Sequence, residues 1–106
     1  MTSRIEQLQQ FIAEDPTDPF PRYGLALEYL HDQPQRARAV FEELLATFPD
    51  YLPAYYPAAH LMIDLQQPQE AERLFQLGMA IAAQQGNQKT ERELRQAYNQ
   101  WLFERE

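Results

Sequence analysis

The feature that most constrains this fold is an internal repeat with a period of about 34 residues. An alanine followed four positions later by a phenylalanine occurs at Ala37 and Phe41, and again one period later at Ala71 and Phe75. The preceding segment also recurs, one position short of that period, as Leu25-Ala26-x2-Tyr29 and Ala58-Ala59-x2-Met62. The residue that the first copy lacks falls in the turn around Gln33-Pro34. Self-similarity at this period predicts a stack of supersecondary units, each burying its apolar face against its neighbours.

Helical periodicity fills the chain between its prolines. Apolar residues recur at spacings of three and four, as in Ile5, Leu8 and Ile12, which is the pattern of a helix with one buried face. No segment alternates with the period of two that a half-buried strand requires. We therefore predict an all-α fold of antiparallel helix pairs with about six helices. The predicted helices are Ser3 to Glu14, Pro19 to His31, Pro34 to Thr47, Pro53 to Gln66, Pro68 to Gln84, and Gln88 to Glu104.

Two kinds of residue depart from regular helical preference within these segments. Pro57 lies four positions after Pro53 and has no N–H to donate back to it, so we expect a late start or a kinked first turn in that helix. Gly24 and Gly78 are isolated, unlike the glycines of a phosphate-binding loop, and we interpret them as points where helices approach closely. Nucleotide binding is therefore not expected.

Length and charge limit the classes of function. A chain of 106 residues is expected to form one domain. It has no cysteine, no signal-peptide pattern at its start and no apolar run of about 18 residues, so we expect a cytoplasmic protein without a membrane span. The formal net charge of -7 repels phosphate backbones and anionic lipid, which require clustered Lys and Arg. Partners are therefore expected to be neutral or basic proteins, not nucleic acids or membranes.

The repeated residues resemble the tetratricopeptide repeat, whose pattern over about 34 residues runs aromatic, large-small pair, large residue, alanine, aromatic and closing proline. The second repeat, counted from Leu52, has Tyr55 in the first aromatic place, and Ala83 replaces its closing proline. The first repeat has Arg22 where the opening aromatic belongs and ends with the closing Pro49. The resemblance implies an α-α superhelix.

The resemblance covers nearly the whole chain and implies a single domain over residues 1–106. Residues 3–16 resemble the second half of a truncated repeat, 19–49 the first repeat, 52–84 the second repeat, and 88–104 the C-terminal capping helix that such arrays require. The tail from Gly86 to Leu94 also resembles the end of a group of small bacterial tetratricopeptide proteins without a well-defined function.

In this family the first helix of each pair lines a concave, protein-binding groove. The resemblance assigns to that groove Phe20, Tyr23, Leu27 and Leu30 of one pair, and Tyr56, His60, Ile63 and Asp64 of the next. The alternative interpretation is that the first of these helices is sandwiched between its neighbours and exposes little. These positions lack the Lys, Arg and Asn with which related domains clamp a chaperone's C-terminal carboxylate, so a hydrophobic or helical segment is the expected ligand.

Catalysis and metal binding find little support. His60 and Asp64 are spaced to face the same way, but two ligands make a weak metal site, and the acidic clusters fall mainly on polar helix faces. We expect no enzyme activity, no cofactor and no metal. The leading hypothesis is an adapter that binds a protein segment; the alternative is a structural subunit that forms a homodimer through exposed apolar residues at its ends, namely Leu102 and Phe103 or Ile5 and Ile12.

Overall fold

The computed structural model describes residues 2–105, and within that range the chain is helical and has no strand. The helices are α1 (Arg4–Glu14), α2 (Phe20–Tyr29), α3 (Pro34–Thr47), the short 3-10 helix η1 (Leu52–Ala54), α4 (Tyr55–Asp64), α5 (Pro68–Gln84) and α6 (Gln88–Glu104). The predicted all-α class is confirmed. No helix among the described residues has the length and apolar character needed to cross a membrane.

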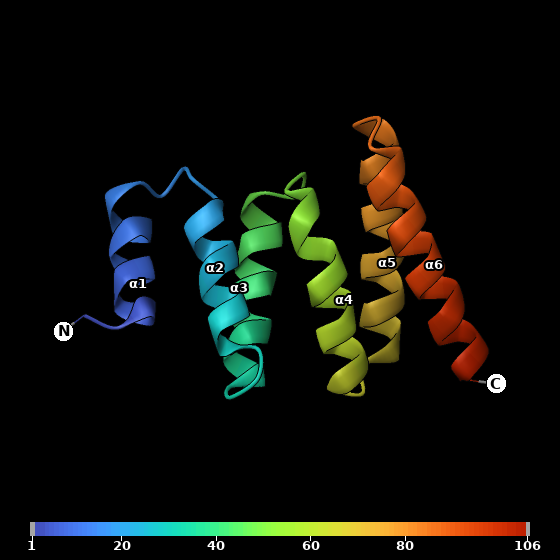
Figure 1. The fold of residues 1–106 in the computed structure, drawn as a ribbon, viewed down its shortest axis with the longest axis horizontal. Coiled ribbons are helices and arrows are strands. Elements are labelled where there is room, and N and C mark those ends of the chain that lie inside the picture. The colour runs from blue at the N-terminus through green and yellow to red at the C-terminus, as the bar shows by residue number, and fades with distance from the viewer. Residues whose placement is uncertain (1, 106) are drawn as a thin grey trace. The chain divides into compact units, whose positions relative to one another are not determined.

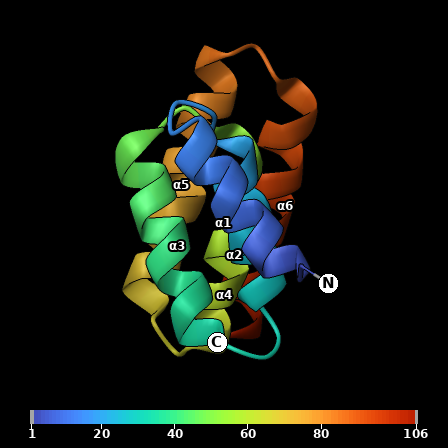
Figure 2. The ribbon, with the colours of Figure 1, turned by 90° about the vertical axis from the view of Figure 1, so that its left-hand side faces the viewer.

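The first compact unit, Met1–Ala54, contains α1, α2 and α3. Each helix runs antiparallel to the next, and α2 packs against both α1 and α3 (Figure 1). Figure 2 shows α1 in front of α2, with α3 to one side. Ala26 and Ala37 are fully buried on adjacent helices, which lets the backbones approach closely. The larger buried side chains of these helices are Leu8, Leu25, Tyr29, Phe41 and Leu44.

The second compact unit, Tyr55–Glu106, contains α4, α5 and α6. Helix α5 packs against both α4 and α6, and neighbouring helices are again antiparallel (Figure 1). Gly78 of α5 marks the closest approach, because a Cβ added there would lie 2.9 Å from Tyr55 Cβ and 3.0 Å from Leu94 Cδ1. The close-packing role predicted for this glycine is thus confirmed. Further buried side chains of these helices are Ala58, Ala59, Met62, Ala71, Leu74, Phe75 and Trp101.

The entry into α4 follows from its two prolines. Leu52–Ala54 forms the 3-10 helix, and the α-helix begins only at Tyr55, which agrees with the expected late start. Pro57 is then the third residue of α4, within the first turn, where backbone N–H groups have no intrahelical partner. The missing N–H of Pro57 therefore leaves no helical hydrogen bond unmade.

The one-residue difference between the two repeats lies where α4 ends. Gln66 adopts a left-handed conformation with φ 58°, the Gln66 N–H donates to Ile63 O at 3.0 Å, and the Gln67 N–H donates to Met62 O at 2.8 Å. Such a reversal satisfies the last carbonyl groups of a helix. Helix α2 instead ends through the Gln33 N–H, which donates to Tyr29 O at 2.9 Å. The first repeat thus lacks the left-handed residue.

Candidate functional site

A series of aromatic rings runs from the surface of the second unit into its core. Tyr56 and His60, one turn apart on α4, have ring centroids 4.5 Å apart. His60 meets Phe75 of α5 edge-on at 5.9 Å, and Phe75 is fully buried beside Trp101 at 5.9 Å. Tyr56, at the outer end, leaves 43% of its surface exposed. The core therefore holds an exposed aromatic ring in a fixed position.

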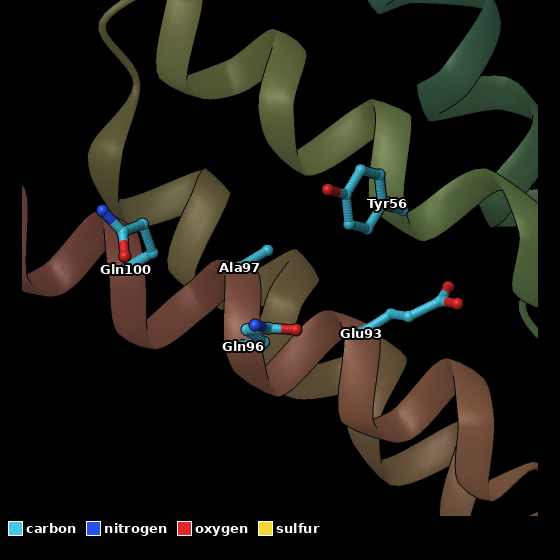
Figure 3. Close-up of a pocket in the computed structure, with 5 residues that line it drawn as sticks. All are labelled: Tyr56, Glu93, Gln96, Ala97 and Gln100. Atoms are coloured by element: carbon cyan, nitrogen blue, oxygen red, sulfur yellow. The ribbon is translucent and has the colours of Figure 1, made fainter.

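Tyr56 forms one wall of a cleft whose opposite wall is α6. The α6 residues that line it are Glu93, Gln96, Ala97 and Gln100, whose spacing of three and four places them on one face of the helix (Figure 3). The cleft has a volume of about 330 Å³. Because α5 packs against both α4 and α6, it holds the two walls apart.

The chemistry of the cleft combines an aromatic surface with polar groups. The amides of Gln96 and Gln100 each carry donors and an acceptor, which suits them to bind peptide backbone. The Glu93 carboxylate lies 4.0 Å from the Lys89 ammonium, and both side chains are mostly exposed. Such an exposed pair is weak, so Glu93 can exchange Lys89 for a cationic group of a ligand.

The imidazole of His60 contacts the ring of Tyr56 but is not among the residues that line the cleft. Its Nε2 atom is covered by protein and has no hydrogen-bond partner among the described residues, while the ring contacts Tyr56 and Phe75. Within residues 2–105, no three His, Cys, Asp or Glu side chains converge as metal ligands. The contacts of His60 are those of an aromatic packing residue.

The other predicted groove residues are not among those that line this cleft. Ile63 is half-buried, and Asp64 is the exposed last residue of α4. Phe20, Tyr23 and Leu27 belong to α2, in the first unit; Phe20 and Leu27 are 60% and 37% exposed. Tyr23 is half-buried, with its ring 5.6 Å from Tyr51. A continuous groove that joins the α2 and α4 residues remains a prediction.

The predicted groove omitted the α6 wall of the cleft. Residues 88–104 resemble a capping helix, whose polar face is expected to contact solvent alone, and Glu93, Gln96 and Gln100 fit that expectation. The sequence does contain a signal for this wall. Glu93, Gln96, Ala97 and Gln100 share one face of the helix, and Ala97 is a small residue among long polar side chains. That alanine leaves room in front of Tyr56.

Burial and hydrogen bonds alter the pKa values of two tyrosines, Tyr98 in the second unit and Tyr51 in the first. Partial burial, together with the hydrogen bond from Tyr98 Oη to Glu72 Oε1 at 2.8 Å, raises the pKa of Tyr98. Partial burial, with the neighbouring Tyr23 and Asp18, raises the pKa of Tyr51. Both phenols therefore stay neutral near pH 7 and act as hydrogen-bonding and packing groups.

Comparisons with known proteins identify similar chains. A family model described as tetratricopeptide repeat matches residues 28–90. A tetratricopeptide repeat domain protein from Salinibacter ruber is similar in its solution NMR structure, with 44% identity, a TM-score of 0.73, and coverage of 78% of this chain and 85% of that chain. Its crystal structure gives 43% identity, a TM-score of 0.71, and coverage of 76% and 90%.

A solution structure of a protein from Bordetella parapertussis is similar in fold alone. Its identity to this chain is 22%, the TM-score is 0.81, and the match covers 98% of this chain and 91% of that chain. No curated protein sequence matches the chain significantly.

Proposed function

The chain belongs to the tetratricopeptide repeat family, and from this premise we propose that it binds a segment of another protein in the cleft between α4 and α6. Tetratricopeptide repeat domains are in general protein–protein interaction modules, and their stacked helices present extended binding surfaces. Proteins of this kind are typically not enzymes, so the proposed activity is binding without turnover.

The observation that carries the proposal is the exposed ring of Tyr56, which packs against His60. An aromatic side chain with two rotatable bonds offers a large contact area and loses little conformational entropy on binding. The contact with His60 at 4.5 Å reduces that loss further, because the ring is already held before a ligand arrives. Tyr56 is therefore proposed as the main apolar contact for the partner.

The polar wall of the cleft supports a partner of defined chemistry. Gln96 and Gln100 can form hydrogen bonds with the backbone of an extended or partly helical segment. Glu93 favours a ligand that has Lys or Arg next to the apolar side chain in contact with Tyr56. The net charge of -7 also attracts a basic segment over distance. We propose a ligand with one apolar or aromatic side chain next to a basic one.

A library of random peptides displayed on phage, selected against the intact chain, tests this proposal. The selected peptides are expected to pair an apolar residue with Lys or Arg. Calorimetric titration of one such peptide should show that Tyr56→Ala weakens binding by about tenfold, or about 1.4 kcal/mol. Glu93→Gln should weaken binding less, and its effect should shrink as salt screens the charge.

The matched control is Leu77→Ala, because Leu77 of α5 has an exposed fraction of 38%, close to that of Tyr56, and does not line the cleft. This variant should bind the peptide as the wild type does. Equal affinity of the wild type and Tyr56→Ala, with unchanged circular dichroism, would rule out the cleft as the binding site.

A further inference from the structure

A second surface, separate from the cleft, lies where α1 meets the start of α2 in the first unit. Phe11 and Phe20 line a hollow of about 350 Å³ there, and their side chains are 47% and 60% exposed. Three carboxylates, from Glu14, Asp15 and Asp18, line the same hollow, and Arg4 is its one basic lining residue. The hollow thus joins exposed aromatic surface to a negative rim.

Hydrogen bonds from the loop between α1 and α2 hold two of these carboxylates in place. Asp15 Oδ1 accepts from the backbone N–H of Thr17 at 3.1 Å and from its hydroxyl at 2.5 Å, and these bonds lower the pKa of Asp15. Asp18 Oδ1 accepts from the backbone N–H of Phe20 at 3.0 Å. The negative charge is therefore fixed beside the phenylalanines before any partner arrives.

The outer surface of α6 in the second unit has complementary properties. Phe103 is 73% exposed and lines a hollow of about 520 Å³. The other residues that line it are Arg92, Arg95, Asn99, and the two glutamines that also line the cleft, Gln96 and Gln100. The lining of this hollow includes two guanidinium groups and no carboxylate. Arg95 pairs with Glu91 at 2.8 Å, and Arg92 Nε donates to the carbonyl of Gln88 at 3.4 Å. Both arginines are exposed, so new partners can reach them.

We propose that these two surfaces bind each other in different copies of the chain, so that the protein associates head to tail. Phe103 of one copy packs against Phe11 and Phe20 of the next, and Arg92 and Arg95 face the carboxylates at the end of α1. Opposite charges around an apolar centre give the contact a single register. Because the two surfaces differ, each copy keeps one surface free, and association continues beyond a dimer unless a ring closes.

This contact differs from a symmetric dimer and from the α4–α6 cleft. A symmetric dimer would join two identical surfaces, whereas the charges of each hollow repel a copy of itself. Tyr56 and Glu93 line only the cleft, while Phe103 lines only the outer hollow of α6. Because Gln96 and Gln100 line both, the two kinds of binding are separated by variants at Tyr56 or Glu93 on one side and at Phe103 on the other.

Sedimentation velocity on two complementary variants tests the proposal. Phe11→Glu blocks the α1 surface and Phe103→Glu blocks the α6 surface, and both substitutions keep a residue that favours helix. The wild type should form species larger than a dimer as its concentration rises, and less so at high salt. Each variant alone should be monomeric over the same range, its association constant reduced by at least about tenfold.

An equimolar mixture of the two variants should form a new species of dimer mass, because each variant supplies the surface that the other lacks. The double variant, mixed with either single variant, should form none. The proposal is wrong if the wild type is monomeric, if Phe11→Glu still forms a dimer, or if the mixture stays monomeric. The first of these results would leave both hollows to a different, hetero-oligomeric partner; the second would indicate a symmetric dimer through α6. Circular dichroism of each variant checks that its fold is retained.

Discussion

At the scale of single residues, the need for glycine at a helix contact depends on which atoms of the neighbouring helix lie beside it. A Cβ added at Gly78 would lie 2.9 Å from the Cβ atom of Tyr55, which cannot move without the α4 backbone. A Cβ added at Gly24 would lie 3.1 Å from Cδ2 of Leu8, the end of a side chain that can rotate away. The packing therefore leaves no room for a Cβ at Gly78 of α5, whereas it can accommodate one at Gly24 of α2.

Gly78→Ala should destabilise the protein, whereas Gly24→Ala should not. Overpacking typically lowers the free energy of unfolding by about 1–3 kcal/mol, whereas replacing a helical glycine by alanine raises it by up to about 1 kcal/mol. The free energy of unfolding should thus fall for Gly78→Ala and stay equal or rise for Gly24→Ala, which urea denaturation can measure. A Gly78→Ala protein as stable as the wild type would contradict this account of the α4–α5 contact.

Arg22 shows what a residue pattern can and cannot predict. The pattern identified Arg22 as a departure from the aromatic found at Tyr55, but it gave no structural reason. In the structure, Arg22 Nη1 donates to Pro16 O at 2.8 Å, and Nε lies 3.6 Å from Glu43 Oε1. The guanidinium also lies over the Phe48 ring at 5.5 Å. Because these contacts come from the loop before α2 and from the C-terminal part of α3, the spacing of the repeat contains no signal for them.

At the scale of helices and turns, helix bounds were predicted correctly where prolines or a regular apolar spacing indicate them. The late start of α4 followed from Pro53 and Pro57, and the bounds of α3, α5 and α6 agree with those predicted. The left-handed turn at Gln66 was not predictable, because a glutamine at positive φ lacks the usual signal of glycine or asparagine.

Gln66→Gly should stabilise the protein, since glycine adopts positive φ without the steric cost that a Cβ adds. We expect the free energy of unfolding to rise by up to about 1 kcal/mol, after the added freedom of the unfolded chain is subtracted. Gln66→Ala is the matched control, because alanine keeps a Cβ at φ 58°, and it should not raise stability. Thermal melts of the two variants that shift in the same direction would contradict the assigned role of Gln66.

At the scale of the whole molecule, the sequence predicted the fold, whereas it did not predict that α6 lines a cleft with Tyr56. The repeat that relates Ala37 to Ala71 is enough to predict stacked helix pairs, because those two alanines are fully buried at helix contacts. The cleft depends on which polar residues of α6 face Tyr56, and exposed polar positions follow no packing rule that periodicity could reveal. The predicted groove, in its α2 part and its α4 part alike, stays a prediction.

The most direct measurement of the central claim is an NMR titration of the isotope-labelled chain with a selected peptide. If the cleft binds the peptide, the largest backbone amide shift changes will occur at Tyr56, His60, Glu93, Gln96 and Gln100. Small changes at those residues, with the largest changes on α1 or on the exposed face of α5, would contradict binding between α4 and α6.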